Sequence, residues 1–257
     1  MYATEKPLSW KEIQGQQILV VGLGGGADII SAYAVAKAIE SPECKIVYGN
    51  TKRVAESDLT QITEHIFEVG KSLSVPNDLS DAFGTTKVDR IVPRCQGCPL
   101  IFKLLEDKKP LLADEIKKYN FDRIIGVDTG GDILQTKKEG EKRGLDHHML
   151  EVLLATEIPV SLVVVGLGSD GETSRDDLQK IIENSEGNGS LQGKLDFAPI
   201  KQYLEQFREQ LPEYRTTNLI LQANDCSETE MLVPRDLRPM IPTSWLLSAL
   251  LFDPKKF

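Results

Sequence analysis

Apolar, β-branched runs alternate along the chain with segments of helical periodicity. Three of these runs end in glycine and acidic residues: ILVVGLGGGAD begins at Ile18, IIGVDTGGD at Ile124 and SLVVVGLGSDGE at Ser161. Continuous apolar strands that alternate with helices are typical of a parallel sheet covered on both faces. The pattern therefore predicts an α/β fold, with a doubly wound, mostly parallel, Rossmann-like sheet and helices on both faces.

Shorter segments complete the expected order of elements. We expect further strands at 45–50 and 218–225, and helices at 59–73, 110–119, 145–156 and 198–211. Thr173 or Ser174, and Asp146, are expected to cap the helices that follow them. Residues 183–193 are rich in glycine, serine and other polar residues, which predicts a flexible loop. The chain is then one domain, in which residues 17–183 form the core of the sheet and residues 184–257 add the loop, an outer helix and closing elements.

Composition narrows the class of protein. The 257 residues carry 27% charged side chains and a net charge of −9, which favours a globular protein and disfavours general nucleic-acid binding. No secretory signal and no run of roughly 18 apolar residues is present, so we expect a cytoplasmic protein without a membrane partner. Edge strands of the sheet would allow a homodimer.

Cysteine usage adds one local pattern. Four cysteines fit a reducing compartment, and Cys95 and Cys98 form a single C-x-x-C. Three interpretations stay open for this pair: an incidental loop, a redox motif, or half of a metal site completed by Cys226 and the histidines at 147 and 148.

The first glycine turn, GLGGGA at 22–27, fits the dinucleotide fingerprint G-x-G-x-x-G/A. Two residues argue against a nicotinamide cofactor. The second strand ends at Asn50, where an acid would hold the ribose, and Asp28 would repel a pyrophosphate at the helix start. NAD is therefore disfavoured, and the backbone at Gly24–Gly26 is expected to cradle another phosphate. No nucleophile elbow, zincin motif or P-loop is present.

The other two turns carry paired carboxylates: Asp128 and Asp132 in GVDTGGD, and Asp170 and Glu172 in GLGSDGE. Loops after parallel strands gather at one sheet edge, so the three turns should lie together. Carboxylates repel an anion unless a divalent cation bridges them; they also supply acids and bases. The alternative is that Asp and Gly are ordinary turn formers.

These considerations define a candidate site. The catalytic candidates are Asp28, Asp128, Asp132, Asp170 and Glu172, with Glu172 or Asp28 as the acid or base. The expected ligands of Mg²⁺ or a similar divalent cation are Asp128, Asp132 and Asp170. The substrate- and phosphate-binding candidates are Gly24, Gly25, Gly26, Thr129, Gly130, Gly131, Asp146, His147 and Gly171.

The motifs VVGLGGGADIISAYAVAKAIE, IIGVDTGGDIL, LDHHML and VVGLGSDGE, with the closing PRDLRPMIPTSWLLSALLFDP, resemble the prokaryotic domain of unknown function 1152 family over roughly Gln17 to Pro254. The resemblance implies a Rossmann-like fold and the same glycine and acidic positions, with added weight on Asp146, but no established reaction. The chain departs from the family pattern at Ala27, after Asp132 and in its doubled histidine.

The sequence thus leads us to expect an enzyme that hydrolyses or transfers a group of a small phosphorylated metabolite, either a sugar phosphate or a nucleotide. A non-catalytic ligand sensor or interaction module is the first alternative. A NAD-linked oxidoreductase is the second.

Overall fold

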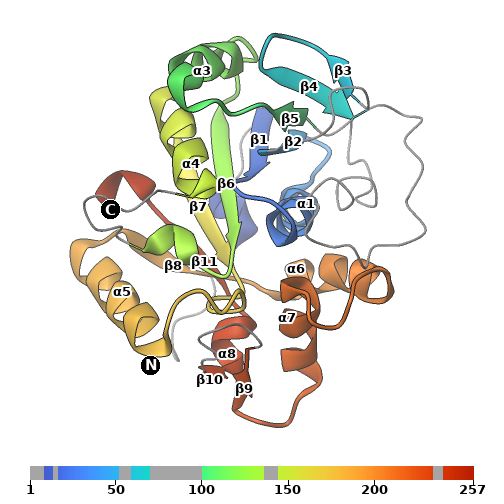
Figure 1. Cartoon of the computed structure of the whole chain (residues 1–257), viewed down its shortest axis with the longest axis vertical. Coiled ribbons are helices and arrows are strands. Elements are labelled where there is room, and N and C mark those ends of the chain that lie inside the picture. The colour runs from blue at the N-terminus through green and yellow to red at the C-terminus, as the bar shows by residue number, and fades with distance from the viewer. Residues whose placement is uncertain (1–8, 14–16, 52–58, 70–99, 136–143, 234–239) are drawn as a thin grey trace.

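The computed structural model describes residues 9–13, 17–51, 59–69, 100–135, 144–233 and 240–257. Its centre is a nine-stranded sheet in the order β3-β4-β5-β2-β1-β6-β7-β11-β8 (Figure 1). The strands are β1 (Gln17–Gly22), β2 (Lys45–Thr51), β3 (Leu59–Gln61), β4 (Ile66–Val69), β5 (Leu100–Phe102), β6 (Arg123–Thr129), β7 (Val160–Val165), β8 (Leu191–Leu195) and β11 (Ala249–Phe252). The five strands from β5 to β7 are parallel, and antiparallel strands flank them on both sides. The mostly parallel α/β sheet is as predicted.

Helices cover both faces of this sheet. They are α1 (Ala27–Ile39), α3 (Lys109–Lys117), α4 (Leu145–Ala155), α5 (Arg175–Asn188), α6 (Ala198–Leu204), α7 (Thr216–Asp225) and α8 (Thr243–Leu246). Short 3-10 helices add η1 (Trp10–Ile13), η3 (Glu106–Lys108), η4 (Asp132–Leu134), η5 (Glu205–Gln210) and η6 (Pro254–Lys256). A small hairpin pairs β9 (Glu230–Leu232) with β10 (Met240–Pro242).

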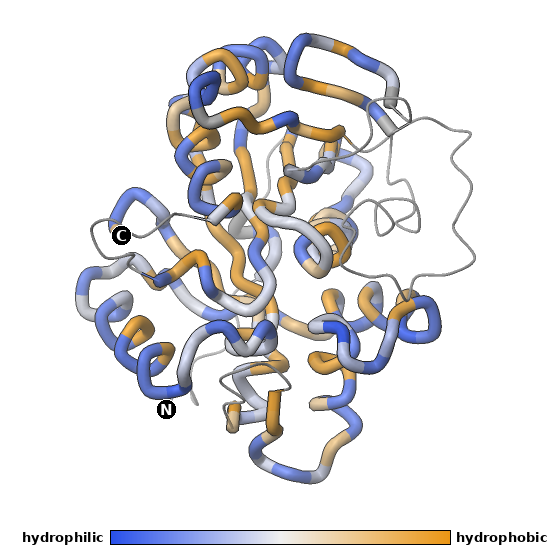
Figure 2. Tube along the Cα trace, viewed as in Figure 1, coloured by the Kyte–Doolittle hydropathy of each residue, from blue (hydrophilic) through white to orange (hydrophobic). Residues whose placement is uncertain are grey.

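Alternate residues of each central strand enter two separate hydrophobic cores. In β1, Ile18 and Val20 pack with α1 and α6, whereas Leu19 and Val21 pack with α3 and α4. Because successive side chains of a strand point to opposite faces, a strand that is buried on both sides has to be apolar throughout. Figure 2 shows the resulting hydrophobic centre between more polar outer segments.

The order of the parallel strands fixes where a ligand would bind. From β1 the chain crosses through α1 to β2 on one side, while β6 lies on the other side of β1. In doubly wound sheets this change of direction leaves a crevice at the carboxyl ends of the two strands. The turns after β1 and β6 both open onto that crevice.

Three local predictions are wrong. Residues 59–69 form the hairpin of β3 and β4 instead of a helix; five β-branched residues and a phenylalanine in this segment favour a strand. Residues 216–225 form helix α7 instead of a strand; a short apolar run does not distinguish the two. The flexible loop predicted at 183–193 is the end of α5, closed by Gly189 at φ 71°, followed by β8.

Two cap predictions have opposite outcomes. Ser174 is the N-cap of α5, and its side chain accepts a hydrogen bond from the N–H of Asp177. Asp146 is not a cap, because Gly144 occupies that position at α4 and Asp146 lies in the first turn.

Across the described ranges, no helix combines the length and apolar character needed to cross a bilayer.

Candidate functional site

Asp28 lies at the start of α1 and ties two distant turns together. Its Oδ2 accepts a hydrogen bond from the backbone N–H of Gly24 at 2.8 Å, and its Oδ1 accepts one from the N–H of Thr129 at 2.9 Å. The carboxylate is 6% exposed. A negative charge in the first turn is also favoured by the helix dipole. Asp28 therefore holds the turn after β1 against the end of β6.

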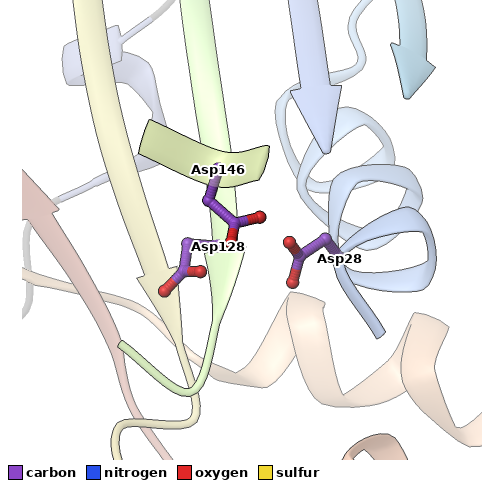
Figure 3. A group of neighbouring side chains, drawn as sticks. All are labelled: Asp28, Asp128 and Asp146. Atoms are coloured by element: carbon purple, nitrogen blue, oxygen red, sulfur yellow. The ribbon is translucent and has the colours of Figure 1, made fainter. Parts of the chain in front are cut away.

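Asp128 and Asp146 complete an acidic group with Asp28. Asp128 is near the end of β6, 1% exposed, and its Oδ2 accepts a hydrogen bond from the N–H of Gly131 at 2.9 Å. Asp146 comes from the first turn of α4 and points toward Asp28 (Figure 3). One carboxylate oxygen from each of the three residues lies within 4.8 Å of the others. They approach closely enough to share one cation.

Glycine makes this approach sterically feasible. A Cβ atom at Gly24 would collide with Oδ1 of Asp146 and would lie 2.8 Å from Oδ2 of Asp28. The glycine at position 24 is thus needed to let the carboxylate of α4 reach the turn after β1.

The turn after β7 packs against the same group. A side chain at Gly130 would collide with the carboxylate of Asp170, and the backbone there has φ 113°, a conformation that favours glycine. Asp170 is buried, and its Oδ1 accepts a hydrogen bond from the N–H of Glu172 at 3.0 Å. The three glycine turns, which are far apart in the sequence, therefore lie side by side.

The carboxylates act on one another electrostatically. Burial raises the pKa of Asp28 well above its ordinary value, and the negative charges of Asp146 and Asp132 raise it further. Burial also raises the pKa of Asp128, followed by the charges of Asp132, Asp28, Asp146 and Asp170. Five aspartates thus share one electrostatic environment, and a bound cation would offset the repulsion among them.

The set close enough to share a cation differs from the predicted ligands. Asp128 is common to both sets, whereas the close group contains Asp28 and Asp146 and does not contain Asp132 or Asp170. Asp132 and Asp170 contribute through their charge. The sequence does not reveal that Asp146 lies beside Asp28 and Asp128, because the position of Asp146 depends on how α4 packs across the sheet.

Several other predicted residues have polar groups that are already engaged. The N–H of Thr129 bonds to Asp28, and its Oγ1 donates to Ser31 at 2.8 Å. The Nε2 of His147 lies 3.3 Å from the carbonyl oxygen of Gln135. Glu172 is exposed. The N–H of Gly171 bonds to the carbonyl of Gly168 at 3.2 Å.

Some backbone N–H groups that were expected to bind phosphate already donate hydrogen bonds within the protein. The N–H groups of Gly24, Gly130 and Gly131 donate to Asp28, to the carbonyl of Val165 and to Asp128, respectively. Within the described ranges, the N–H groups of Gly25 and Gly26 have no acceptor. Of the five glycines, these two are therefore the ones whose N–H groups remain available to an anion.

Arg215 is a residue that the sequence analysis missed. It is the N-cap residue of α7, and its Nη1 would lie 3.9 Å from a Cβ at Gly26. Gly26, Arg215 and Thr216 line a small hollow at the start of α1. The only sequence signal was a single arginine before a helix, 189 positions from Gly26. Topology, rather than a motif, brings the two together.

Two of the four cysteines, Cys44 and Cys226, belong to the described residues. Cys95 and Cys98 lie outside the described residues, so the three interpretations of that pair stay predictions. Within the part of the chain that the structure describes, Cys44 and Cys226 form no disulfide.

Comparison with known proteins gives one family. Residues 105–224 match the family described as Protein of unknown function (DUF1152). No curated protein and no solved structure matches the chain. The matched segment contains Asp128, Asp132, Asp146 and Asp170, while Asp28 and the first glycine turn precede it. The resemblance to the DUF1152 family that the sequence motifs predict is therefore confirmed over residues 105–224.

Proposed function

We propose that the protein is an enzyme that acts on a small phosphorylated metabolite, a sugar phosphate or a nucleotide, by hydrolysis or group transfer with a divalent cation. One observation carries the proposal: two buried carboxylates from β6 and α1 and a partly exposed one from α4 converge beside the start of α1, where two backbone N–H groups and an arginine could receive an anion. Carboxylates and anion-binding groups side by side are the combination that a metal–phosphate ligand requires.

The donor set fits Mg²⁺ or a similar cation. Asp28, Asp128 and Asp146 offer carboxylate oxygens, which hard divalent cations prefer. Burial, and then the negative charge of neighbouring aspartates, raises the pKa of Asp28 and Asp128; a bound cation would offset the negative charge. When bound, the cation would neutralise phosphate charge and polarise a phosphoryl oxygen.

The phosphate is assigned to the start of α1. Gly25 and Gly26 would donate backbone hydrogen bonds, and the helix dipole favours a negative charge at that end. Arg215 would add a charge-assisted hydrogen bond from the first turn of α7. This arrangement narrows the sequence-based cradle of Gly24–Gly26 to its last two residues.

The proton-transfer role is assigned to Asp146. Both oxygens of Asp28 already accept backbone hydrogen bonds, so Asp28 is suited to holding the site in shape. Asp146 is partly exposed and faces Asp28 from the rim. It can therefore accept a proton from a water or a substrate hydroxyl and exchange it with solvent. Glu172 is exposed and is not needed in this scheme.

Thermal unfolding, followed by a turnover assay, tests the proposal. We would measure the Tm of the full chain with ATP, AMP and glucose 6-phosphate, each with and without Mg²⁺, and then assay stabilising compounds for phosphate release and group transfer. We expect at least one compound to raise the Tm more with Mg²⁺ than without it and to be turned over. Glu172→Gln should retain both effects. Asp146→Asn should lose turnover and weaken the Mg²⁺-dependent part of the Tm increase, because Asp146 is also a proposed ligand of the cation.

Other outcomes would identify the alternatives. Tight binding without turnover would favour the ligand sensor. A Tm increase with NAD alone would favour the oxidoreductase. No response to any phosphorylated compound would contradict the proposal.

A further inference from the structure

A second cavity lies between α4 and α5, apart from the carboxylates. Its volume is about 340 Å³. Helix α4 packs against α3, and its residues His147, Leu150 and Leu154 line this space. Because residues three, four and seven apart share one face of a helix, this is a continuous face of α4.

Helix α5 presents a matching face. Ile181, Asn184 and Ser185 line the cavity from that side, and η4 and η6 complete its wall. The volume is at the small end of the range of roughly 300–1,000 Å³ that is typical of small-molecule sites. The walls combine apolar side chains with a few hydrogen-bonding groups, which is also typical of such sites.

The charges around the cavity indicate what it would accept. Its one carboxylate among the described residues, Glu151, is paired with Lys109 at 2.6 Å. His147 approaches the carbonyl of Gln135. The remaining polar groups are neutral amides and a hydroxyl. Among the described side chains that line the cavity, a charged ligand would find no unpaired opposite charge, whereas an uncharged apolar ligand could bury its surface.

We propose that the cavity between α4 and α5 is a binding site for a compact, uncharged and mostly apolar molecule, such as a ring system with one or two hydrogen-bonding groups. It is separate from the proposed phosphate site, although the two share an element. Asp146 and His147 are neighbours in the first turn of α4, about 100° apart around its axis. The first faces Asp28 and the second faces the cavity.

The test uses N-phenyl-1-naphthylamine, an uncharged fluorophore with a naphthyl and a phenyl group. Its fluorescence increases in apolar surroundings. We would titrate it into the full chain and into two tryptophan variants. Asn184→Trp places a large side chain at the exposed rim of the cavity. Glu183→Trp makes the same change one residue earlier, at an exposed position that does not line the cavity.

We expect saturable binding of one probe molecule per chain, weakened at least about tenfold by Asn184→Trp because the cavity is filled. Glu183→Trp should keep the affinity. Asp128→Asn should also keep it, since that residue belongs to the other site. Absence of saturable binding, equal weakening by both tryptophan variants, or loss of probe binding in Asp128→Asn would overturn the proposal. Circular dichroism of each variant confirms that it is folded.

Discussion

The Asp28 carboxylate accepts a hydrogen bond from the backbone N–H of Thr129 at 2.9 Å, across 101 positions of sequence. Its second oxygen accepts from Gly24. These two bonds join the turn after β1 to the end of β6 at the point where the sheet changes direction. The candidate site is thus built on rigid strand ends, and Asp28 is its principal link.

Asp28→Asn should lower the free energy of unfolding by about 1–3 kcal/mol, because an amide offers one oxygen to two buried N–H donors. Asp146→Asn should be neutral or stabilising in the absence of a cation, since it removes a negative charge that raises the pKa of Asp28. Urea unfolding of both variants measures the difference. Equal destabilisation by the two changes would contradict the role given to Asp28.

Gly24→Ala should destabilise the chain by roughly 1–3 kcal/mol, because the added methyl group collides with the carboxylate of Asp146. It should also weaken cation binding by pushing Asp146 away from Asp28. Gly187→Ala is the matched control: a Cβ there meets nothing within 4 Å, and because Gly187 is the second-to-last residue of α5, the change should leave the stability within about 0.5 kcal/mol of the wild type. Thermal unfolding and a Mg²⁺ titration measure both effects. An unchanged Mg²⁺ affinity in Gly24→Ala would show that Asp146 is not a ligand.

Stability should depend on pH through the buried aspartates. The folded-state pKa of Asp128 is raised above its ordinary value of 3.8, so between these two values the folded chain binds more protons than the unfolded chain. The stabilising contribution is therefore complete below about pH 3.8 and is lost as the pH rises through the folded-state pKa. Urea unfolding between about pH 5 and pH 8 should show that Asp128→Asn gains stability relative to the wild type as the pH rises. A constant difference over that range would argue against the raised pKa.

The central part of the fold was predictable because burial on both faces leaves a plain sequence pattern. β1, β6 and β7 are apolar at every position that enters either core, and each is followed by glycine where the turn requires it. Parallel-sheet geometry then brings Asp28, Asp128 and Asp170 to one edge. Short elements were not predictable in the same way: the apolar run of α7 also fits a strand.

Part of the candidate site depends on packing between distant elements. Asp146 reaches Asp28 because α4 lies across the end of β6, and Arg215 reaches Gly26 because α7 begins beside α1. Neither the approach of Asp146 to Asp28 nor that of Arg215 to Gly26 follows from sequence periodicity. Likewise, the sequence does not show that the Gly24 N–H is occupied by Asp28 while those of Gly25 and Gly26 are not.

Arg215→Gln should weaken binding of a phosphorylated ligand by at least about tenfold, because a charge-assisted hydrogen bond contributes roughly 1.5–3 kcal/mol. Binding of Mg²⁺ alone should be unchanged or slightly stronger, since the variant removes a nearby positive charge. Arg175→Gln, an exposed arginine paired with Glu230, is the control and should leave both affinities unchanged. Ligand titrations with the phosphorylated compound that stabilises the chain measure these values. Equal loss in both variants would remove Arg215 from the site.

The central claim is that carboxylates from three elements form one cation site, and calorimetric titration of Mg²⁺ into the metal-free full chain tests it most directly. We predict one binding site in the wild type, its loss in Asp128→Asn, and its retention in Asp114→Asn, which makes the same chemical change at an exposed position of α3. Repeating the titration with Mn²⁺ covers the case in which a different divalent cation is preferred. Absence of binding by either cation, or binding that persists unchanged in Asp128→Asn, would contradict the account.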